Sequence, residues 1–177
     1  MKLRIKKGLF TWQIINENKI LVSKISNKKL FGFAKKICDA QGKIVYTTGI
    51  INLPITKKHW NNAEFKRYIV YQNEQPFATA TFHYAVLPEK SRLQILIRPP
   101  QIDKMNVDTP YGVFFVKREQ NNSVTIMQNN ELLATITPFF SFKKMYITHN
   151  EKFDDTFFST IYMLIEYMMH EDDLIIV

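Results

Sequence analysis

Cysteine and glycine are both scarce in this sequence of 177 residues. Cys38 is the only cysteine, so no disulfide can form within the chain, and a small secreted fold stapled by disulfides is excluded. The five glycines are scattered, so no glycine-rich loop is available to cradle a phosphate. Five glycines and seven prolines also leave no low-complexity linker. We therefore expect a single domain that spans residues 1–177.

Long apolar runs are missing as well. No stretch of about 18 apolar residues occurs, so no transmembrane helix is predicted. The opening residues, MKLRIKKGLFTW, carry positive charge but are not followed by the apolar segment of a signal peptide. These absences predict a cytoplasmic protein, and its basic charge leaves peripheral attachment to a membrane as an open alternative.

The motifs of common enzymes are also absent. The sequence has no G-x-S-x-G, H-E-x-x-H, P-loop or C-x-x-C pattern. Its four histidines, which are His59, His83, His149 and His170, share no spacing typical of metal ligands. We therefore predict no catalytic residue, no metal site and no cofactor, and we do not expect an enzyme.

Acidic residues are few in the first 150 positions, where 23 Lys and Arg face nine Asp and Glu. From Glu151 onward the balance reverses, with seven acids and one base. The whole chain carries a formal net charge of +8. A basic body predicts an anionic partner such as phospholipid headgroups or nucleic acid, although the charge could also serve solubility alone.

Alternating polar and apolar residues indicate many β-strands. In KLRIKK the three bases Lys2, Arg4 and Lys6 share one face, and Leu3 and Ile5 share the other. Further strand pairs flank polar turns at residues 16–19 and 39–42, which is typical of β-hairpins.

One hairpin pattern recurs at a spacing of 56 residues. QNEQPFATATF at 72–82 matches QNNELLATITP at 128–138. The same spacing aligns the first hairpin, so that Ile14, Val70 and Ile126 correspond, and so do Val22, Ala78 and Ala134. We interpret this as repetition of a hairpin unit, with chance similarity among β-rich segments as the alternative.

The C-terminal segment has a different period. FDDTFFSTIYMLIEYMMHEDD predicts a helix from about residue 154 to 170, with Asp154 as its N-cap and Phe153 and Phe158 as a hydrophobic staple. It is apolar around nearly all of its circumference, which is typical of a buried helix. At about 24 Å it is too short to span a bilayer. A helix on a membrane surface or against a partner is the alternative. We expect the strands to close into a barrel around this helix.

Taken together, the hairpins and the terminal helix DDTFFSTIYMLIEYMM resemble the tubby C-terminal-like superfamily, which includes LURP-one-related proteins and phospholipid scramblases. The hairpins that carry the resemblance are CDAQGKIVYTT, YQNEQPFATAT and MQNNELLATIT. The resemblance implies a mainly β fold, a closed antiparallel barrel of about twelve strands with a hydrophobic C-terminal helix threaded through it. It also implies phosphoinositide binding, as for tubby, or lipid association, as for scramblases. The acidic calcium loop and the cysteine cluster of scramblases are absent from this sequence.

Basic pairs beside aromatic residues supply the candidate contacts. Because neighbouring residues in a strand face opposite ways, one residue of each pair can join a given surface. The candidate anion- or lipid-binding residues are Lys2, Arg4, Lys6, Lys35, Lys36, Lys66, Arg67, Lys143 and Lys144. We predict a non-enzymatic binding module for anionic surfaces, and phospholipid headgroups are the favoured partner. The alternatives are a protein-interaction or regulatory module and a binder of single-stranded nucleic acid.

Overall fold

The computed structural model describes residues 1–9, 11–28, 33–53, 66–84, 102–137 and 145–170. These ranges contain twelve β-strands and one α-helix, which is labelled α2 (Asp155–His170). The strands are β1 (Lys2–Lys7), β2 (Thr11–Ile15), β3 (Leu21–Asn27), β4 (Lys35–Asp39), β5 (Ile44–Asn52), β6 (Lys66–Gln72), β7 (Gln75–Tyr84), β8 (Ile102–Thr109), β9 (Gly112–Arg118), β10 (Val124–Gln128), β11 (Glu131–Ile136) and β12 (Met145–His149).

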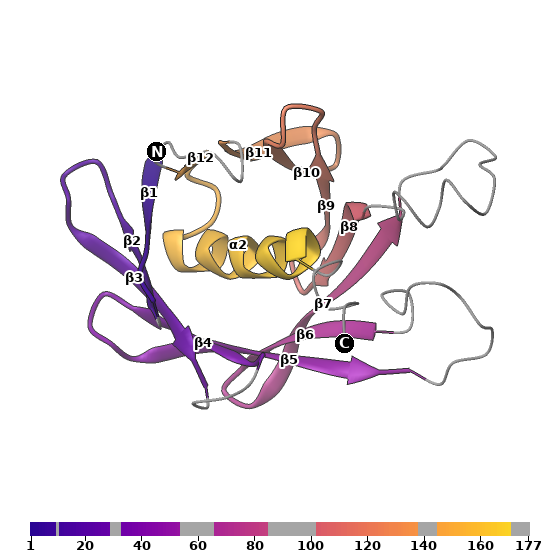
Figure 1. Cartoon of the computed structure of the whole chain (residues 1–177), viewed down its shortest axis with the longest axis horizontal. Helices are drawn as coiled ribbons and strands as arrows, with labels where there is room; N and C mark the ends of the chain where they lie inside the picture. The colour runs from indigo at the N-terminus through magenta and orange to yellow at the C-terminus, as the bar shows by residue number, and fades with distance from the viewer. Residues whose placement is uncertain (10, 29–32, 54–65, 85–101, 138–144, 171–177) are drawn as a thin grey trace.

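All twelve strands belong to one closed antiparallel barrel in which each strand pairs with its neighbours in the sequence. The barrel closes between the first strand and the last, where Lys2 of β1 pairs with Thr148 of β12. Figure 1 shows the strands arranged around α2, with β1 beside β12. Closure leaves no free sheet edge between these strands. The predicted twelve-stranded antiparallel barrel is confirmed.

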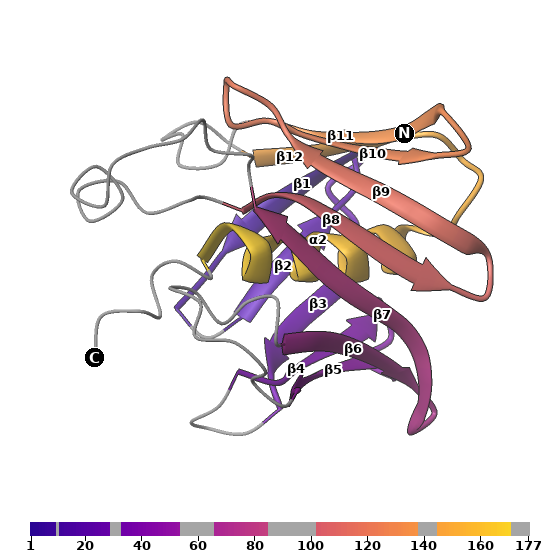
Figure 2. The same cartoon turned by 90° about the vertical axis from the view of Figure 1, so that its right-hand side faces the viewer.

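The helix α2 lies inside the ring of strands in both views (Figures 1 and 2). Twelve of its residues are buried, and these include three polar ones, Ser159, Thr160 and Glu166. Ser159 Oγ and Thr160 Oγ1 donate hydrogen bonds to the carbonyl oxygens one turn earlier, at 2.7 and 2.9 Å. These bonds remove the cost of burying the two hydroxyl groups. The helix is therefore the centre of the core, as its apolar circumference predicts. No helix in the described ranges has the length and apolar character needed to cross a membrane.

The start of α2 has the predicted cap. Asp154 Oδ1 accepts a hydrogen bond of 2.8 Å from the backbone N–H of Phe157. Phe153 and Phe158 lie on either side of the first turn with ring centroids 6.3 Å apart, as expected for a hydrophobic staple. The cap satisfies a backbone donor that has no partner within the helix.

The two matching segments form equivalent hairpins. Each has a two-residue turn in the left-handed region, at Asn73–Glu74 (φ 49° and 64°) and at Asn129–Asn130 (φ 50° and 64°). Each also has a register shift at the same place, directly after Val70 in β6 and directly after Ile126 in β10. The repeat prediction is confirmed for this pair, because turn type and register shift both recur.

The first hairpin follows the repeat on one arm and departs from it on the other. Its register also shifts after Ile14, as the alignment with Val70 and Ile126 requires. Ile14 pairs with Ser23, however, whereas Val70 pairs with Ala78. The prediction that Val22 is equivalent to Ala78 is therefore wrong by one residue, because a longer turn from Asn16 to Ile20 displaces the second arm.

The barrel has two distinct ends. We call the end where α2 begins the turn end, because the turns that follow β2, β4, β6, β8 and β10 lie there. We call the end where α2 finishes the exit end. Lys7 at the end of β1 contacts Glu166 near the end of α2, whereas the Met1 ammonium donates to the His149 carbonyl beside the start of α2. The strand β1 thus runs from the turn end to the exit end.

Candidate anion-binding site

The outer face of β1 carries three of the candidate bases. Leu3 and Ile5 are buried in the core, so Lys2, Arg4 and Lys6 face away from it. This arrangement follows from the local alternation of the sequence and holds in the closed barrel.

The basic face continues across the neighbouring strands. Lys6 pairs with Gln13 of β2, and Gln13 pairs with Lys24 of β3. On β4, Lys36 pairs with Ser26 of β3. We define the basic wall as Lys2, Arg4, Lys6, Lys24 and Lys36. The residues of β1 to β4 that face outward include these five bases and no Asp or Glu.

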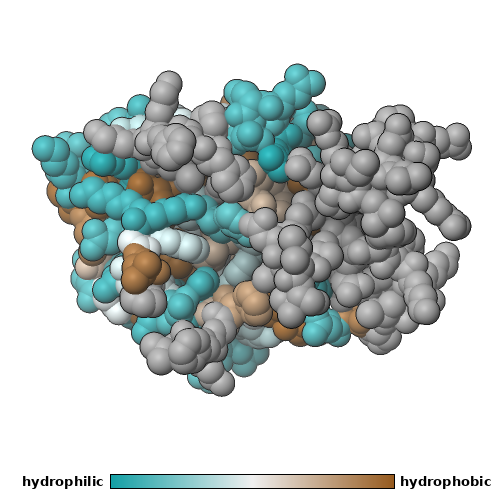
Figure 3. Space-filling view, viewed as in Figure 1, coloured by the Kyte–Doolittle hydropathy of each residue, from teal (hydrophilic) through white to brown (hydrophobic). Residues whose placement is uncertain are grey.

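The space-filling view in Figure 3 shows the polarity of this region, though not the sign of its charge. Hydrophilic residues interleave with smaller apolar patches where Figure 1 draws β1 to β3 (Figure 3). The three strand spacings between β1 and β4 spread the charges over roughly 14 Å. The basic wall is therefore an extended surface, which suits an array of anionic groups better than one small ligand.

Part of the basic wall borders a groove of about 250 Å³ near the turn end. The residues that line it are Lys2, Arg4, Ile15, Asn16, Glu17, Lys19 and Tyr146. The Lys2 ammonium lies 4.4 Å from the centroid of the Tyr146 ring. Arg4 Nε is buried, and no hydrogen-bond acceptor for it exists among the described residues. Three bases, Lys2, Arg4 and Lys19, line the groove against one acid, Glu17, so its charge favours an anion.

Sequence reasoning missed two basic residues here. Lys24 could have been found, because it alternates with Ser23 and Ile25 in the pattern of a strand. Lys19 has φ 63° and lies in the turn that displaces the second arm of the first hairpin. Its place beside Lys2 depends on the pairing of β1 with β2, which no local signal in the sequence reports.

The predicted pairs divide as the strand geometry requires. Lys36 faces outward on β4, whereas Lys35 is partly buried at the exit end, where its Nζ donates a 2.5 Å hydrogen bond to Asn27 Oδ1. Lys66 and Arg67 are half-buried at the start of β6, two strands beyond β4. The structure therefore does not bring them to the groove. Lys143 and Lys144 lie outside the described residues.

The exit end holds a buried carboxylate surrounded by donors. Glu166 is 4% exposed, and its Oε1 lies 2.8 Å from Lys7 Nζ and accepts a 2.5 Å hydrogen bond from Tyr162. His170 Nε2 lies 3.5 Å from Glu166 Oε2. Burial raises the pKa of Glu166, but the hydrogen bonds from His170, Lys7 and Tyr162 and the Lys7 charge outweigh it and leave the pKa below its usual value. The carboxylate is thus held in its charged form.

The same cluster affects the neighbouring titratable groups. Burial, followed by the Glu166 charge, raises the pKa of Tyr162 well above its usual value. Burial lowers the pKa of Lys35, and the Glu166 charge offsets this only in part. The exit end therefore holds one firmly ionised acid and an ammonium that is poorly solvated.

Metal binding and thiol chemistry are two further possibilities in the described ranges. These ranges contain no group of three or more His, Cys, Asp and Glu side chains that could hold a metal ion. Cys38 is a buried free thiol. Neither observation adds a site to the two barrel ends.

Comparison with known proteins supports the fold. The chain is similar to the X-ray structure of a protein from Arabidopsis thaliana, with a TM-score of 0.51 and 9% sequence identity. The match covers 93% of this chain and 88% of the Arabidopsis chain. No protein-family model matches the sequence, and no curated protein matches it. At this low identity the similarity concerns the fold alone.

Proposed function

We propose that the chain is a non-enzymatic binding module that attaches to anionic phospholipid surfaces through the basic wall. The observation that carries the proposal is the outer face of β1 to β4, where five bases occur without an acid. The opposite side offers a contrast, because Lys117 of β9 lies 3.1 Å from Glu119 and is paired with it. The basic wall thus gathers positive charge on strands whose described outward-facing residues include no acid.

The binding free energy of such a surface is the sum of contributions from its individual bases, and it depends on the salt concentration. Each Lys or Arg near an anionic membrane contributes on the order of 1 kcal/mol, so five bases acting together are sufficient for measurable binding. The groove beside Lys2 and Arg4 supplies one place where a phosphate can approach more closely than the open wall allows. The partner in this proposal is the headgroup layer, and no catalytic step is involved.

The proposal includes membership of the tubby C-terminal-like superfamily and a cytoplasmic location with peripheral attachment. The closed twelve-stranded barrel around one C-terminal helix supports the family, because this is the architecture that the resemblance implies. The basic wall supports the attachment.

Vesicle co-sedimentation tests the function. We expect the protein to bind vesicles that contain phosphatidylglycerol and to ignore neutral phosphatidylcholine vesicles. Changing Lys2, Arg4 and Lys6 together to Gln should lower partitioning by about a hundredfold, since three contacts of about 1 kcal/mol are lost. Raising salt from 0.1 to 1 M should release the wild type, because the Debye length falls from about 10 to about 3 Å.

The matched control is a triple variant with the same charge change elsewhere, in which Lys104, Lys117 and Lys152 become Gln. It should bind nearly as well as the wild type, because these residues lie off the basic wall. Equal binding to both vesicle types would overturn the proposal and favour a protein partner. Displacement of the protein from vesicles by single-stranded DNA would favour nucleic acid instead.

A further inference from the structure

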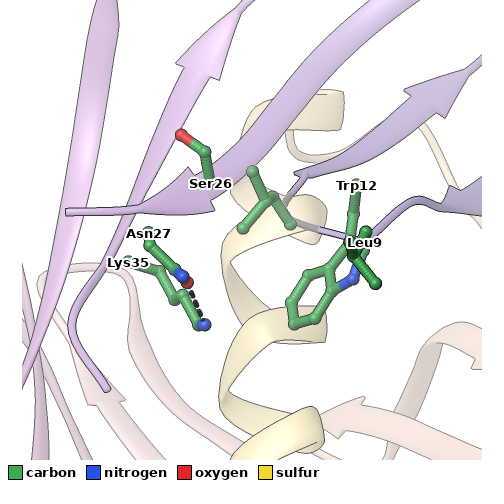
Figure 4. A pocket seen from close by; sticks show the side chains of 6 residues that line it. Leu9, Trp12, Ser26, Asn27 and Lys35 are labelled. Carbon is green, nitrogen blue, oxygen red and sulfur yellow. Dashed lines mark hydrogen bonds between the residues drawn. The ribbon is translucent and has the colours of Figure 1, made fainter. Parts of the chain in front are cut away.

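A second cavity lies at the exit end, away from the turn-end groove. It has a volume of about 100 Å³ and is lined by Leu9, Trp12, Ile25, Ser26, Asn27 and Lys35. Figure 4 shows the Lys35 and Asn27 side chains on one side and the Trp12 ring on the other, with α2 behind them. The lining residues that the structure describes include no acid.

Lys35 and Asn27 both keep hydrogen-bond donors that have no acceptor within the described chain. Lys35 Nζ has one hydrogen bond within the described chain, to Asn27 Oδ1, so two of its three N–H groups have no acceptor. Because the Asn27 oxygen is used in this bond, its amide nitrogen remains as a further donor. The charge of Glu166 acts on Lys35, but this carboxylate already binds Lys7 and Tyr162.

The surroundings strengthen any charge interaction made here. The Lys35 ammonium lies 5.4 Å from the centroid of the Trp12 ring, and the Lys7 ammonium lies 5.8 Å from the same centroid. Burial lowers the pKa of Lys35, which means that its positive charge is incompletely solvated. An anion placed beside Lys35 would restore that solvation in a site where an indole ring limits the access of water.

Size restricts the ligand. A cavity of about 100 Å³ is large enough for several waters or for one tetrahedral anion. Pockets for drug-sized ligands are about 300–1,000 Å³, so a whole nucleotide does not fit inside. We infer that this cavity binds one phosphate group, either as inorganic phosphate or as the terminal phosphate of a larger molecule, through Lys35 and Asn27. This inference does not depend on the proposed function, which rests on the basic wall.

Tryptophan fluorescence gives a direct test. The chain has two tryptophans, and Trp60→Phe leaves Trp12 as the only tryptophan, whose emission can be excited apart from that of the tyrosines. In this background we expect inorganic phosphate to change Trp12 emission saturably at constant ionic strength, with a Kd on the order of 1 mM. Sulfate should compete because it has the same shape and charge type, whereas chloride should not.

Lys35 and Lys36 form a matched pair of variants. Lys35→Gln should weaken phosphate binding by at least about tenfold, because a charge-assisted hydrogen bond is lost. Lys36→Gln makes the same charge change on the outward face and should alter binding by less than about twofold. Absence of a saturable signal, or equal losses in both variants, would overturn the inference.

Two further measurements keep the result interpretable. Asn27→Leu replaces Lys35→Gln if the latter fails to fold, and broadening of the ³¹P resonance of inorganic phosphate by wild-type protein provides a readout independent of Trp12. A variant that carries Lys2→Gln, Arg4→Gln and Lys6→Gln is also tested with phosphatidic acid vesicles. This test distinguishes a lipid phosphate from a soluble phosphate as the ligand. A Trp12 response to these vesicles assigns a headgroup, a response to inorganic phosphate alone assigns a soluble ligand, and no response to either overturns the site.

Discussion

The helix α2 packs against the barrel through different contacts at the two ends. At the turn end the first turn of the helix packs into an aromatic cluster, in which Phe157 lies 5.2 Å from Phe114 and 5.9 Å from Tyr111 between ring centroids. At the exit end the last turns place a carboxylate, Glu166, against Lys7 and Tyr162. Both ends use aromatic packing, as in the stack of Tyr167 on Tyr68 at the exit end, but the exit end also buries a charged carboxylate.

This difference assigns most of the folding free energy to the turn end and ligand binding to the exit end. Apolar and aromatic burial contributes free energy of folding in proportion to the area removed from water. A buried ion pair contributes little net stability, because desolvation offsets the attraction. The exit end therefore keeps donors such as Lys35 at the cost of stability, and it is the end at which we infer a ligand cavity.

The largest expected loss of stability comes from disrupting the aromatic cluster at the turn end. Phe157→Ala should lower the free energy of unfolding by about 3–5 kcal/mol, because it removes a side chain that is 1% exposed from the centre of the cluster. Urea denaturation measures the change. Leu9→Ala serves as the control at the exit end; this side chain is 90% exposed and should change stability by less than about 0.5 kcal/mol. A Phe157 effect no larger than the control would refute the assignment of stability to the turn end.

An intermediate effect is expected at the charged end. Glu166→Gln should cost about 1–3 kcal/mol at neutral pH, because Lys7 loses its charged partner while remaining only 40% exposed. The exposed pair of Glu131 and Lys152 provides the control, and Glu131→Gln should cost less than about 0.5 kcal/mol.

The pH dependence sharpens the same prediction. The pKa of Glu166 is lower in the folded protein than its ordinary value of 4.5, so below that pH the unfolded state binds more protons. The stability that Glu166 contributes is present above pH 4.5 and is lost as the pH falls through the folded pKa. Unfolding measured as the pH is lowered through the ordinary value of 4.5 should show a steeper loss of stability for wild type than for Glu166→Gln. Parallel curves would contradict the role of the charge.

The smallest expected effect concerns the helix cap. Asp154→Ala should destabilise the protein by about 1 kcal/mol, because the N–H of Phe157 loses its acceptor. Asp154→Asn keeps an acceptor oxygen and should recover most of the loss. Thermal melting compares the two variants, and an Asn variant as unstable as the Ala variant would argue against capping.

Features that depend on neighbouring residues were predictable. Alternation in KLRIKK places Lys2 and Arg4 outside the core, and the apolar circumference of residues 154–170 predicts a helix buried in the barrel. The matching hairpins could be recognised because an Asn at each turn tolerates a left-handed φ. These properties follow from local periodicity and turn chemistry, and both can be read from a short segment of the sequence.

Other features depend on residues that are distant in the sequence. The sequence by itself determined that Lys35 and Lys36 face opposite sides of their strand, but the pairing register of β2, β3 and β4 decided that Lys35 meets Asn27 and Trp12. Packing of α2 inside the closed barrel brought Lys7 of the first strand to Glu166. Such contacts arise from strand order and register, in which a change of one residue reverses the face that a side chain occupies, so only the tertiary structure could establish them.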